Sequence, residues 1–327
     1  MIYATSREIT EVFKHLKTGT NYLAFRCFLV LVSIITISCS SAFSQTVRVG
    51  LLNRTEITNV LFSPKSGKYV LLNAENDTVY RFRSDDAISI TAAEKGVLVK
   101  SAYGLNDTLS EVHIVGSGPS ASFKIRVGSD SKEHSYFSNL SVFNRENLLS
   151  LVSDLDVEQY VGRVVQAEVG YGAVEEYYKI QSMICRTYAI RNLERHTLDG
   201  YDLCDHEHCQ VYTGLKSTSN EVVKATSATS GLIMVDPNDK LILSAFHANC
   251  GGQTSNSEDV WKESRTYLVS VEDTFCTESR SATWEKTMPL SQFLVQIGFS
   301  TDTTCLNNCF FDQSNRKKFF TLKNDSV

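Results

Sequence analysis

The stretch LDVEQYVGRVVQAEVGYG, residues 155–172, marks the point where the hydrophobic pattern of this chain changes. Apolar residues now recur at positions i, i+4, i+7 and i+8, the spacing of one helix face. These residues are Val157, Val161, Val164 and Val165. Asp154 or Asp156 is available as the N-cap, and Gly170 with Gly172 ends the run. The pattern predicts an amphipathic helix that begins near Val157 and stops at Gly170.

Upstream of this helix the chain has a β-rich pattern. Short runs of β-favouring residues are separated by turn clusters such as 63–67 and 116–119. The runs are 47–52, 69–72, 88–90, 97–99, 112–115, 123–127 and 136–142. This spacing predicts a small all-β unit. The unit has no Cys, and its first His is His134, so we expect a structural or docking role rather than a chemical one.

Downstream, helical and extended patterns alternate. A second helix is predicted over 174–196, with Tyr177, Ile180 and Ile184 on one stripe and further apolar residues on another, so we expect it to be buried. A short helix at 225–230 follows, and two strands are then expected around the turn at 236–239. These strands are 231–235 and 241–247. The predicted fold is therefore α+β, with a small β-rich N-terminal unit (45–144) followed by an α+β unit (145–327).

Residues 1–44 have the features of a signal peptide. The apolar part, 27–37, has the length of a signal-peptide core and is short for a membrane span of about 20 residues. Ala42-Phe43-Ser44 fits the small-x-small cleavage rule, which predicts a mature chain from Gln45. We expect an exported protein of the cell envelope. It would be anchored in the membrane through its N-terminus only if the signal is uncleaved or lipidated.

Composition excludes several classes of protein. Hydrophobic residues make up 42% and charged residues 21% of the 327 residues, which rules out a wholly disordered or fibrous chain. The net charge of -5 and the lack of basic runs argue against a nucleic-acid partner. The chain also lacks a phosphate-binding Gly-Lys-Ser/Thr loop, a dinucleotide Gly motif and a Gly-x-Ser-x-Gly elbow.

Two charged residues stand on apolar stripes of the predicted helices. Glu168 follows Val157 by eleven positions and so lies on the same stripe. A carboxyl there either escapes past the helix end or is partly buried. Burial would favour its neutral form, which can act as a general acid. Arg186 interrupts the second helix's other stripe, where it could snorkel or pair with a carboxylate.

The segment 196–210 concentrates metal-binding residue types. It holds His196, His206 and His208 together with Cys204 and Cys209. Thiolate and imidazole are preferred zinc ligands, so a Cys2His2 set is chemically complete. A disulfide between the two thiols is the alternative, since an oxidising compartment favours it. Further along the chain, Cys250-Gly-Gly-Gln-Thr254 has the flexibility of a loop where backbone approaches a ligand. Cys250, Cys276, Cys305 and Cys309 offer several pairings that sequence does not resolve.

The order of these motifs resembles the stage II sporulation protein D (SpoIID/LytB) family. The resemblance covers about residues 150–276. It rests on LDVEQYVGRVVQAE (155–168), KIQSMICRTYAI (179–190), YDLCDHEHCQVYTG (201–214), TSG (229–231), HANCGGQT (247–254), Val260-Trp261 and Tyr267-Leu268. The β-rich region 47–144 fits the family's N-terminal portion only in pattern.

The resemblance implies work on peptidoglycan. Sporulation members are lytic transglycosylases that cut between N-acetylmuramic acid and N-acetylglucosamine and leave 1,6-anhydromuramyl ends. The family's catalytic Glu corresponds to Glu168, and Arg186 is expected to assist it. Some members hold zinc, which here would use Cys204, His208 and Cys209 with His196 or His206 as the fourth ligand. The residues expected to contact the glycan are Tyr188, Tyr201, Gln210, Tyr212, His247, Gly251, Gly252 and Thr254.

Other members of the family are described as enhancers of a cell-wall amidase. A non-catalytic wall-binding protein or amidase enhancer is therefore the alternative function, and a cell-wall amidase the alternative partner. The family's usual C-terminal Gly-His-Gly-Val-Gly…Ser-Gln segment is absent from the sequence. We accordingly expect a catalytic unit that is incomplete at its C-terminus. Whether it serves sporulation or general wall remodelling is left open.

Overall fold

A computed structural model describes residues 45–296, except 84, 129–131, 280–281 and 283–285, together with Cys309–Phe310 and Thr321–Leu322. The predicted signal peptide lies outside the described residues. The chain divides into two compact units, Met1–Ser230 and Gly231–Val327. Within the described residues, no helix has the length and apolar character needed to cross a bilayer.

The first unit is built on an 11-stranded sheet with the order β11-β1-β10-β9-β7-β2-β4-β5-β6. β3 pairs with β2 and β8 with β7 outside this path. The strands are β1 Thr46–Leu51, β2 Asn59–Leu72, β3 Thr78–Arg81, β4 Ile88–Ala93, β5 Gly96–Ser101, β6 Asn106–Leu109, β7 Glu111–Val127, β8 Glu133–Phe137, β9 Asn139–Arg145, β10 Leu148–Asp156 and β11 Leu203–Cys204. All pairs are antiparallel except β1 with β11. The α+β class is confirmed, and the predicted boundary at residue 144 lies within β9.

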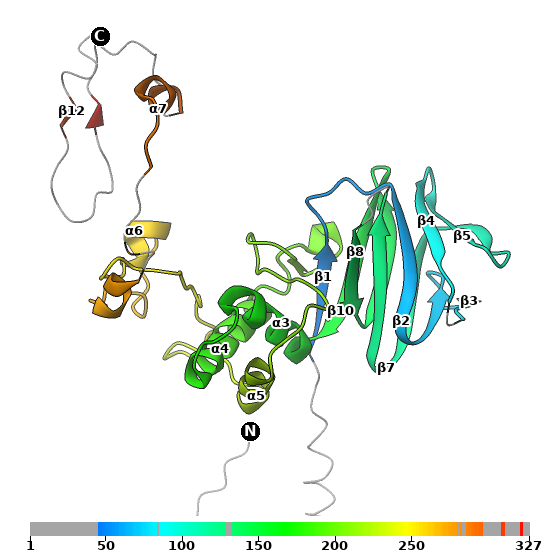
Figure 1. The fold of residues 1–327 in the computed structure, drawn as a ribbon, viewed down its shortest axis with the longest axis horizontal. Coiled ribbons are helices and arrows are strands. Elements are labelled where there is room, and N and C mark those ends of the chain that lie inside the picture. The colour runs from blue at the N-terminus through cyan, green and yellow to red at the C-terminus, as the bar shows by residue number, and fades with distance from the viewer. Residues whose placement is uncertain are drawn as a thin grey trace, which may run out of the picture. The chain divides into compact units, whose positions relative to one another are not determined.

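The two predicted turn clusters are not chain reversals. Residues 63–67 lie inside β2 and 116–119 inside β7, and these long strands pair with each other (Figure 1). The register shifts between Pro64 and Ser66 and again between Ser66 and Lys68. Bulges of this kind accept the Pro and Gly that would otherwise break a strand. The prediction of separate short strands was wrong here, because the turn-forming residues lie at irregularities of the β2–β7 pairing and do not end either strand.

Helix α3 (Val157–Val169) follows the sequence prediction closely. The Asp156 carboxylate caps it by accepting from the amides of Glu158 and Gln159 at 2.8 and 3.2 Å. Gly170 ends it with φ of 79°, a conformation that favours glycine. The valines of the predicted stripe are buried. Local capping and periodicity were therefore sufficient to predict this helix.

Helix α4 (Glu175–Arg191) turns a different face to the core from the one expected. Tyr177 and Ile180 of the predicted stripe are 47% and 49% exposed. Cys185 and Arg186 are fully buried instead, against α3 and α5 (Asn220–Ala228). The expected burial of the stripe was wrong, because the helix turns inward the face that carries Cys185 and Arg186. The short predicted helix at 225–230 begins earlier, at Asn220.

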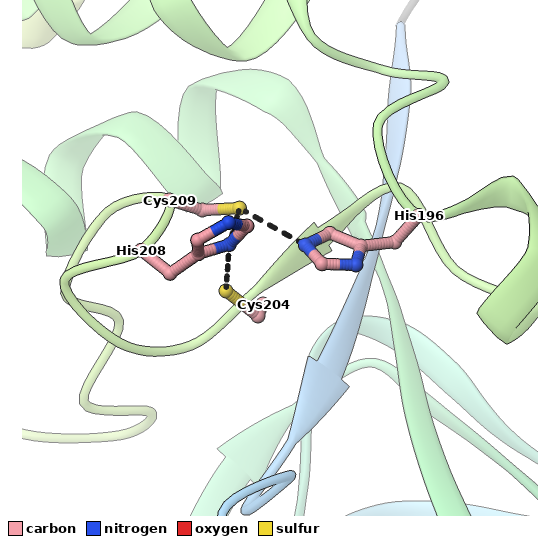
Figure 2. A group of neighbouring side chains, drawn as sticks. All are labelled: His196, Cys204, His208 and Cys209. Carbon is pink, nitrogen blue, oxygen red and sulfur yellow. Dashed lines mark hydrogen bonds between the residues drawn. The ribbon is translucent and has the colours of Figure 1, made fainter.

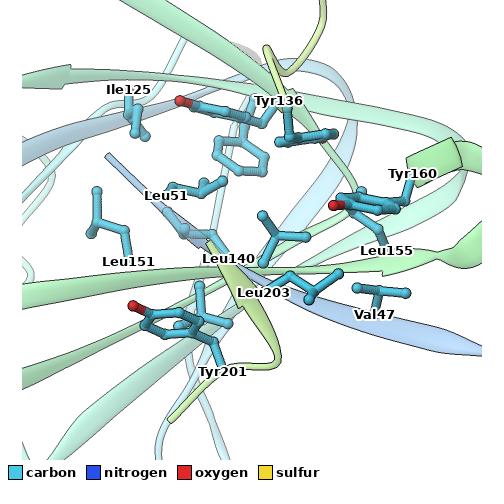
Figure 3. Packing of buried hydrophobic residues seen from close by; sticks show 14 of the residues in the cluster. Val47, Leu51, Ile125, Tyr136, Leu140, Leu151, Leu155, Tyr160, Tyr201 and Leu203 are labelled. Carbon is cyan, nitrogen blue, oxygen red and sulfur yellow. The ribbon is translucent and has the colours of Figure 1, made fainter. Parts of the chain in front are cut away.

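One hydrophobic core runs from the sheet into the helices. Figure 3 shows Val47 and Leu155 near Tyr160 of α3, and Leu203 of β11 among the sheet residues. Helices α3, α4 and α5 lie beside the β1–β10 end of the sheet (Figure 1). This end of the sheet therefore supports the segments in which the predicted chemical residues lie.

The second unit has little regular structure in its described part. Its elements are α6 Ser257–Trp261, the 3-10 helix η2 Thr274–Glu278, α7 Leu290–Gln296, β12 Cys309–Phe310 and β13 Thr321–Leu322. The strands expected at 231–235 and 241–247 are reduced to one antiparallel bridge between Val235 and Leu241. The Asp236–Asp239 turn does close between them, with Asp239 donating to the Asp236 carbonyl at 3.0 Å.

Candidate functional site

The Cys/His segment leaves helix α4 and is fastened to the edge of the sheet. It runs through the 3-10 helix η1 (Thr197–Asp199) into β11, which pairs in parallel with β1. The Asp205 carboxylate accepts from the amide of Leu52 at 2.7 Å. The chain then folds back, and the backbone amide of Cys209 donates to the His206 carbonyl at 3.0 Å. Cys204 is therefore fixed by the sheet, and Cys209 by the turn that follows it.

Four potential metal ligands converge in this segment. Figure 2 shows the side chains of His196, Cys204, His208 and Cys209 pointing toward one another, and their ligand atoms lie within 4.8 Å of each other. His208 Nδ1 is 3.6 Å from Cys204 Sγ and 3.7 Å from Cys209 Sγ. Cys209 Sγ is 3.5 Å from His196 Nε2. His196, and not His206, is therefore the fourth member of the group.

These separations fit a tetrahedral zinc ion. Zinc lies about 2.3 Å from sulfur and about 2.0 Å from nitrogen, which sets sulfur and nitrogen ligands roughly 3.5 Å apart in a tetrahedron. The three sulfur–nitrogen distances, 3.5, 3.6 and 3.7 Å, agree with that value. Burial raises the pKa of the Cys209 thiol to about 12. A bound cation would be needed to keep that thiol as thiolate near neutral pH.

The ring of His196 is oriented by a second layer of contacts. Its Nδ1 lies 3.0 Å from the Asp199 carboxylate, which leaves Nε2 directed at Cys209. Asp199 also pairs with Arg145, and hydrogen bonds from His196 and Arg145 hold the pKa of its carboxyl below the usual value. Tyr201 stacks on the His196 ring at 5.0 Å. A carboxylate behind a metal-binding imidazole is the usual support for such a ligand.

Glu168 lies at the end of α3 and contacts the same segment. Its Oε1 accepts a hydrogen bond from the amide of Val211 at 3.0 Å, two residues beyond Cys209. Its Oε2 makes no hydrogen bond within the described part of the chain. Glu168 is half-buried. Cys185 lies close enough for the charge of Glu168 to add to the burial that raises the pKa of this thiol to about 12.

Arg186 has a partner that the sequence did not reveal. Its guanidinium is fully buried and binds the Glu158 carboxylate through Nε at 2.8 Å and Nη2 at 2.6 Å. It also donates to the carbonyls of Ser182 and Thr226, both at 3.4 Å. Arg186 therefore joins α3, α4 and α5. Its assistance to Glu168 stays a prediction, and no sequence signal singled out Glu158.

Three of the residues expected to bind glycan are buried in this unit. Tyr201, Gln210 and Tyr212 are 8%, 3% and 3% exposed. Gln210 accepts from Tyr160 at 3.2 Å, and the Tyr212 ring stacks on Tyr160 with centroids 5.6 Å apart. These side chains are therefore packed into the interior and offer little surface to a ligand in this conformation.

Tyr188 is more accessible than these three residues and lies at the edge of the donor cluster. Its hydroxyl lies 3.5 Å from the His208 carbonyl and accepts from Arg195 at 3.2 Å. Burial and the nearby Cys209 raise its pKa to about 12. The remaining predicted residues lie in the second unit, where His247 and Gly251 are exposed and Gly252 and Thr254 half-buried. Their contact with glycan is still a prediction.

Comparison with known proteins identifies the central part of the chain. Residues 145–235, which carry Glu168 and all four donors, match the family model described as stage II sporulation protein, SpoIID. Over these residues the chain is similar to the SpoIID family. The stage II sporulation protein D of Bacillus subtilis is 25% identical over 166 residues, 46% of this chain and 48% of that protein. The family resemblance read from the motifs is thus confirmed.

Two further relatives match this chain over different lengths. An uncharacterised protein of Brachyspira hyodysenteriae is 27% identical over 198 residues, 60% of this chain and 52% of its own length. The amidase enhancer of Bacillus subtilis is 35% identical over 99 residues, 30% of this chain and 13% of the relative. The chain thus spans about half the length of the first two relatives and a small part of the third.

Proposed function

We propose that this protein is an exported lytic transglycosylase that cleaves peptidoglycan glycan strands with Glu168 as its general acid and base. The observation that carries the proposal is the position of this carboxyl. It closes helix α3, one oxygen is held by the Val211 amide, and the other makes no hydrogen bond within the described residues. The segment that holds it is the one that carries the four potential zinc ligands.

The proposed reaction needs only one acid–base group. Glu168 donates a proton to the glycosidic oxygen as the bond between that oxygen and the muramyl anomeric carbon breaks. The carboxylate then takes the proton of the muramyl C6 hydroxyl as the C6 oxygen bonds to the same carbon, which gives a 1,6-anhydro ring. No water is consumed, so a second carboxylate to activate one is not required.

We further propose that His196, Cys204, His208 and Cys209 hold one zinc ion. Bound zinc would crosslink the segment and so fix the amide of Val211 that positions Glu168. This role is structural, since four protein ligands fill a tetrahedral site.

Purified protein handled without chelator should contain about one zinc per chain. His196→Ala should lose most of it on dialysis because one of four ligands is removed. His206→Ala is the matched control and should keep its zinc, since His206 lies outside the donor group. Trypsin releases all four donors in one peptide, 196–216. If that peptide is two hydrogens lighter and the protein carries no metal, Cys204 and Cys209 form a disulfide and the zinc proposal fails.

The products of digestion test the proposed reaction itself. Purified protein incubated with intact glycan strands should release fragments that end in 1,6-anhydromuramyl residues, detected by mass spectrometry. Glycan that stays uncut favours the alternative function, an amidase enhancer, as one relative is named. That alternative is tested directly by adding a cell-wall amidase and measuring the rate of stem-peptide release with and without this protein.

A further inference from the structure

Two thiols in the second unit converge on one carboxylate oxygen. Cys250 Sγ lies 3.4 Å and Cys276 Sγ 3.2 Å from Oδ2 of Asp273. The ligand atoms of the three residues lie within 4.8 Å of one another. Cys276 is of intermediate exposure, and Cys250 is the more buried of the two. Neither residue belongs to the Glu168 site or to the donor group of the first unit.

The backbone brings these two cysteines together. Segments 250–254 and 271–276 run antiparallel in a register defined by three contacts. The contacts are Thr254 N to Val271 O at 2.9 Å, the bridge between Gln253 and Glu272, and Asp273 N to Gly252 O at 2.9 Å. Continuing this register sets Cys250 beside Phe275, the neighbour of Cys276. Asn249 adds a side-chain hydrogen bond to the Cys276 carbonyl at 2.9 Å. The two thiols are therefore near neighbours across a paired loop.

In its described residues, the surrounding unit has little apolar core to hold this loop. Among its described residues, Leu294 is the single buried hydrophobic side chain. Many large apolar side chains are exposed instead. They are Leu232, Ile233, Val235, Phe246, Val260, Trp261, Val269, Val271, Phe275 and Val295. Small units with little buried apolar surface are commonly stabilised by disulfides or metals.

We propose that Cys250 and Cys276 form a disulfide that closes the 250–276 loop and fixes the Gly251-Gly252 turn. Two S–H bonds break and one S–S bond forms, with two protons and two electrons leaving the thiols. The electrons reduce a disulfide of a thiol–disulfide oxidoreductase or of oxidised glutathione, which becomes two thiols. Only the place of this oxidation in the cell rests on the proposed export. The pairing itself does not depend on it.

The pairing is tested on the whole purified protein. Reduced protein is incubated with oxidised glutathione, its remaining thiols are alkylated, and it is digested with trypsin without reductant. Trypsin separates the two cysteines into peptides 241–262 and 266–280. We expect these peptides to be joined as one species that a reductant splits. Recovery of both as alkylated single peptides would overturn the proposal. So would a link from either to another cysteine, or a metal ion that copurifies and protects both thiols.

Native-state proteolysis measures what the bridge does. Lys262 lies inside the closed loop and is exposed. Reducing the oxidised wild type should speed tryptic cleavage at Lys262 by about tenfold or more, because loop closure limits local opening. Cys250→Ser, Cys276→Ser and the double variant should all cleave at the reduced wild-type rate, with or without reductant. Additive effects of the two substitutions would show that each thiol acts separately. A wild-type cleavage rate that does not change with reductant would show that no bridge limits the opening of this loop. Either result would overturn the proposal.

Discussion

Glu168→Gln should abolish most of the proposed glycan-cleaving activity while leaving the fold intact. Gln keeps the size of the side chain and an oxygen that can accept from the Val211 amide. It cannot give a proton to the leaving oxygen. General acid–base catalysis contributes about 10²–10⁴-fold, so the rate of anhydromuramyl product formation should fall by at least that factor. Glycan binding and the melting temperature should change little.

Glu176→Gln is the matched control for this experiment. Glu176 lies in the first turn of α4, and its side chain is 76% exposed, 3.8 Å from Lys179. The same chemical change there should leave product formation at the wild-type rate. Release of anhydromuramyl ends by Glu168→Gln at near wild-type rate would show that another group supplies the proton, and the assignment of Glu168 would be wrong.

Glu158→Gln should destabilise the first unit strongly. Arg186 is fully buried, and its charge is matched by the Glu158 carboxylate at 2.6 and 2.8 Å. Breaking a buried ion pair by removing one partner costs about 3–5 kcal/mol, and the 28% exposure of Glu158 favours the lower figure. At about 2–4 °C per kcal/mol for a unit of this size, the melting temperature should fall by about 6–12 °C. Thermal unfolding followed by circular dichroism measures this shift.

Two variants separate the buried charge from other causes. Glu175→Gln removes an exposed pairing with Lys179, 2.6 Å away on the same helix, and should leave the melting temperature close to that of the wild type. Adding Arg186→Met to Glu158→Gln should recover part of the lost stability, because the uncompensated charge goes with the arginine. If Glu158→Gln melts within about 2 °C of wild type, the pair does not hold the three helices together.

Features set by neighbouring residues were predictable from the sequence. Helix α3 is local in origin: Asp156 caps it, the valine stripe gives it a face, and Gly170 ends it. The donor group was also visible, because Cys204, His208 and Cys209 lie within six consecutive positions. Short-range order of this kind depends on backbone geometry and side-chain reach along one segment. The rest of the chain need not be known.

Features that join distant segments were decided by the tertiary structure alone. Arg186 on the inner face of α4 is paired with Glu158 of α3, and Tyr177 on another face of α4 is exposed. His196 was preferred to His206 as a ligand because η1 and β11 bring it to Cys209. The residue types in the sequence indicate which side chains could form ion pairs or bind a metal. Only the packing of helices and strands sets which of them come within hydrogen-bond distance, since periodicity gives a residue's face and not what lies opposite it.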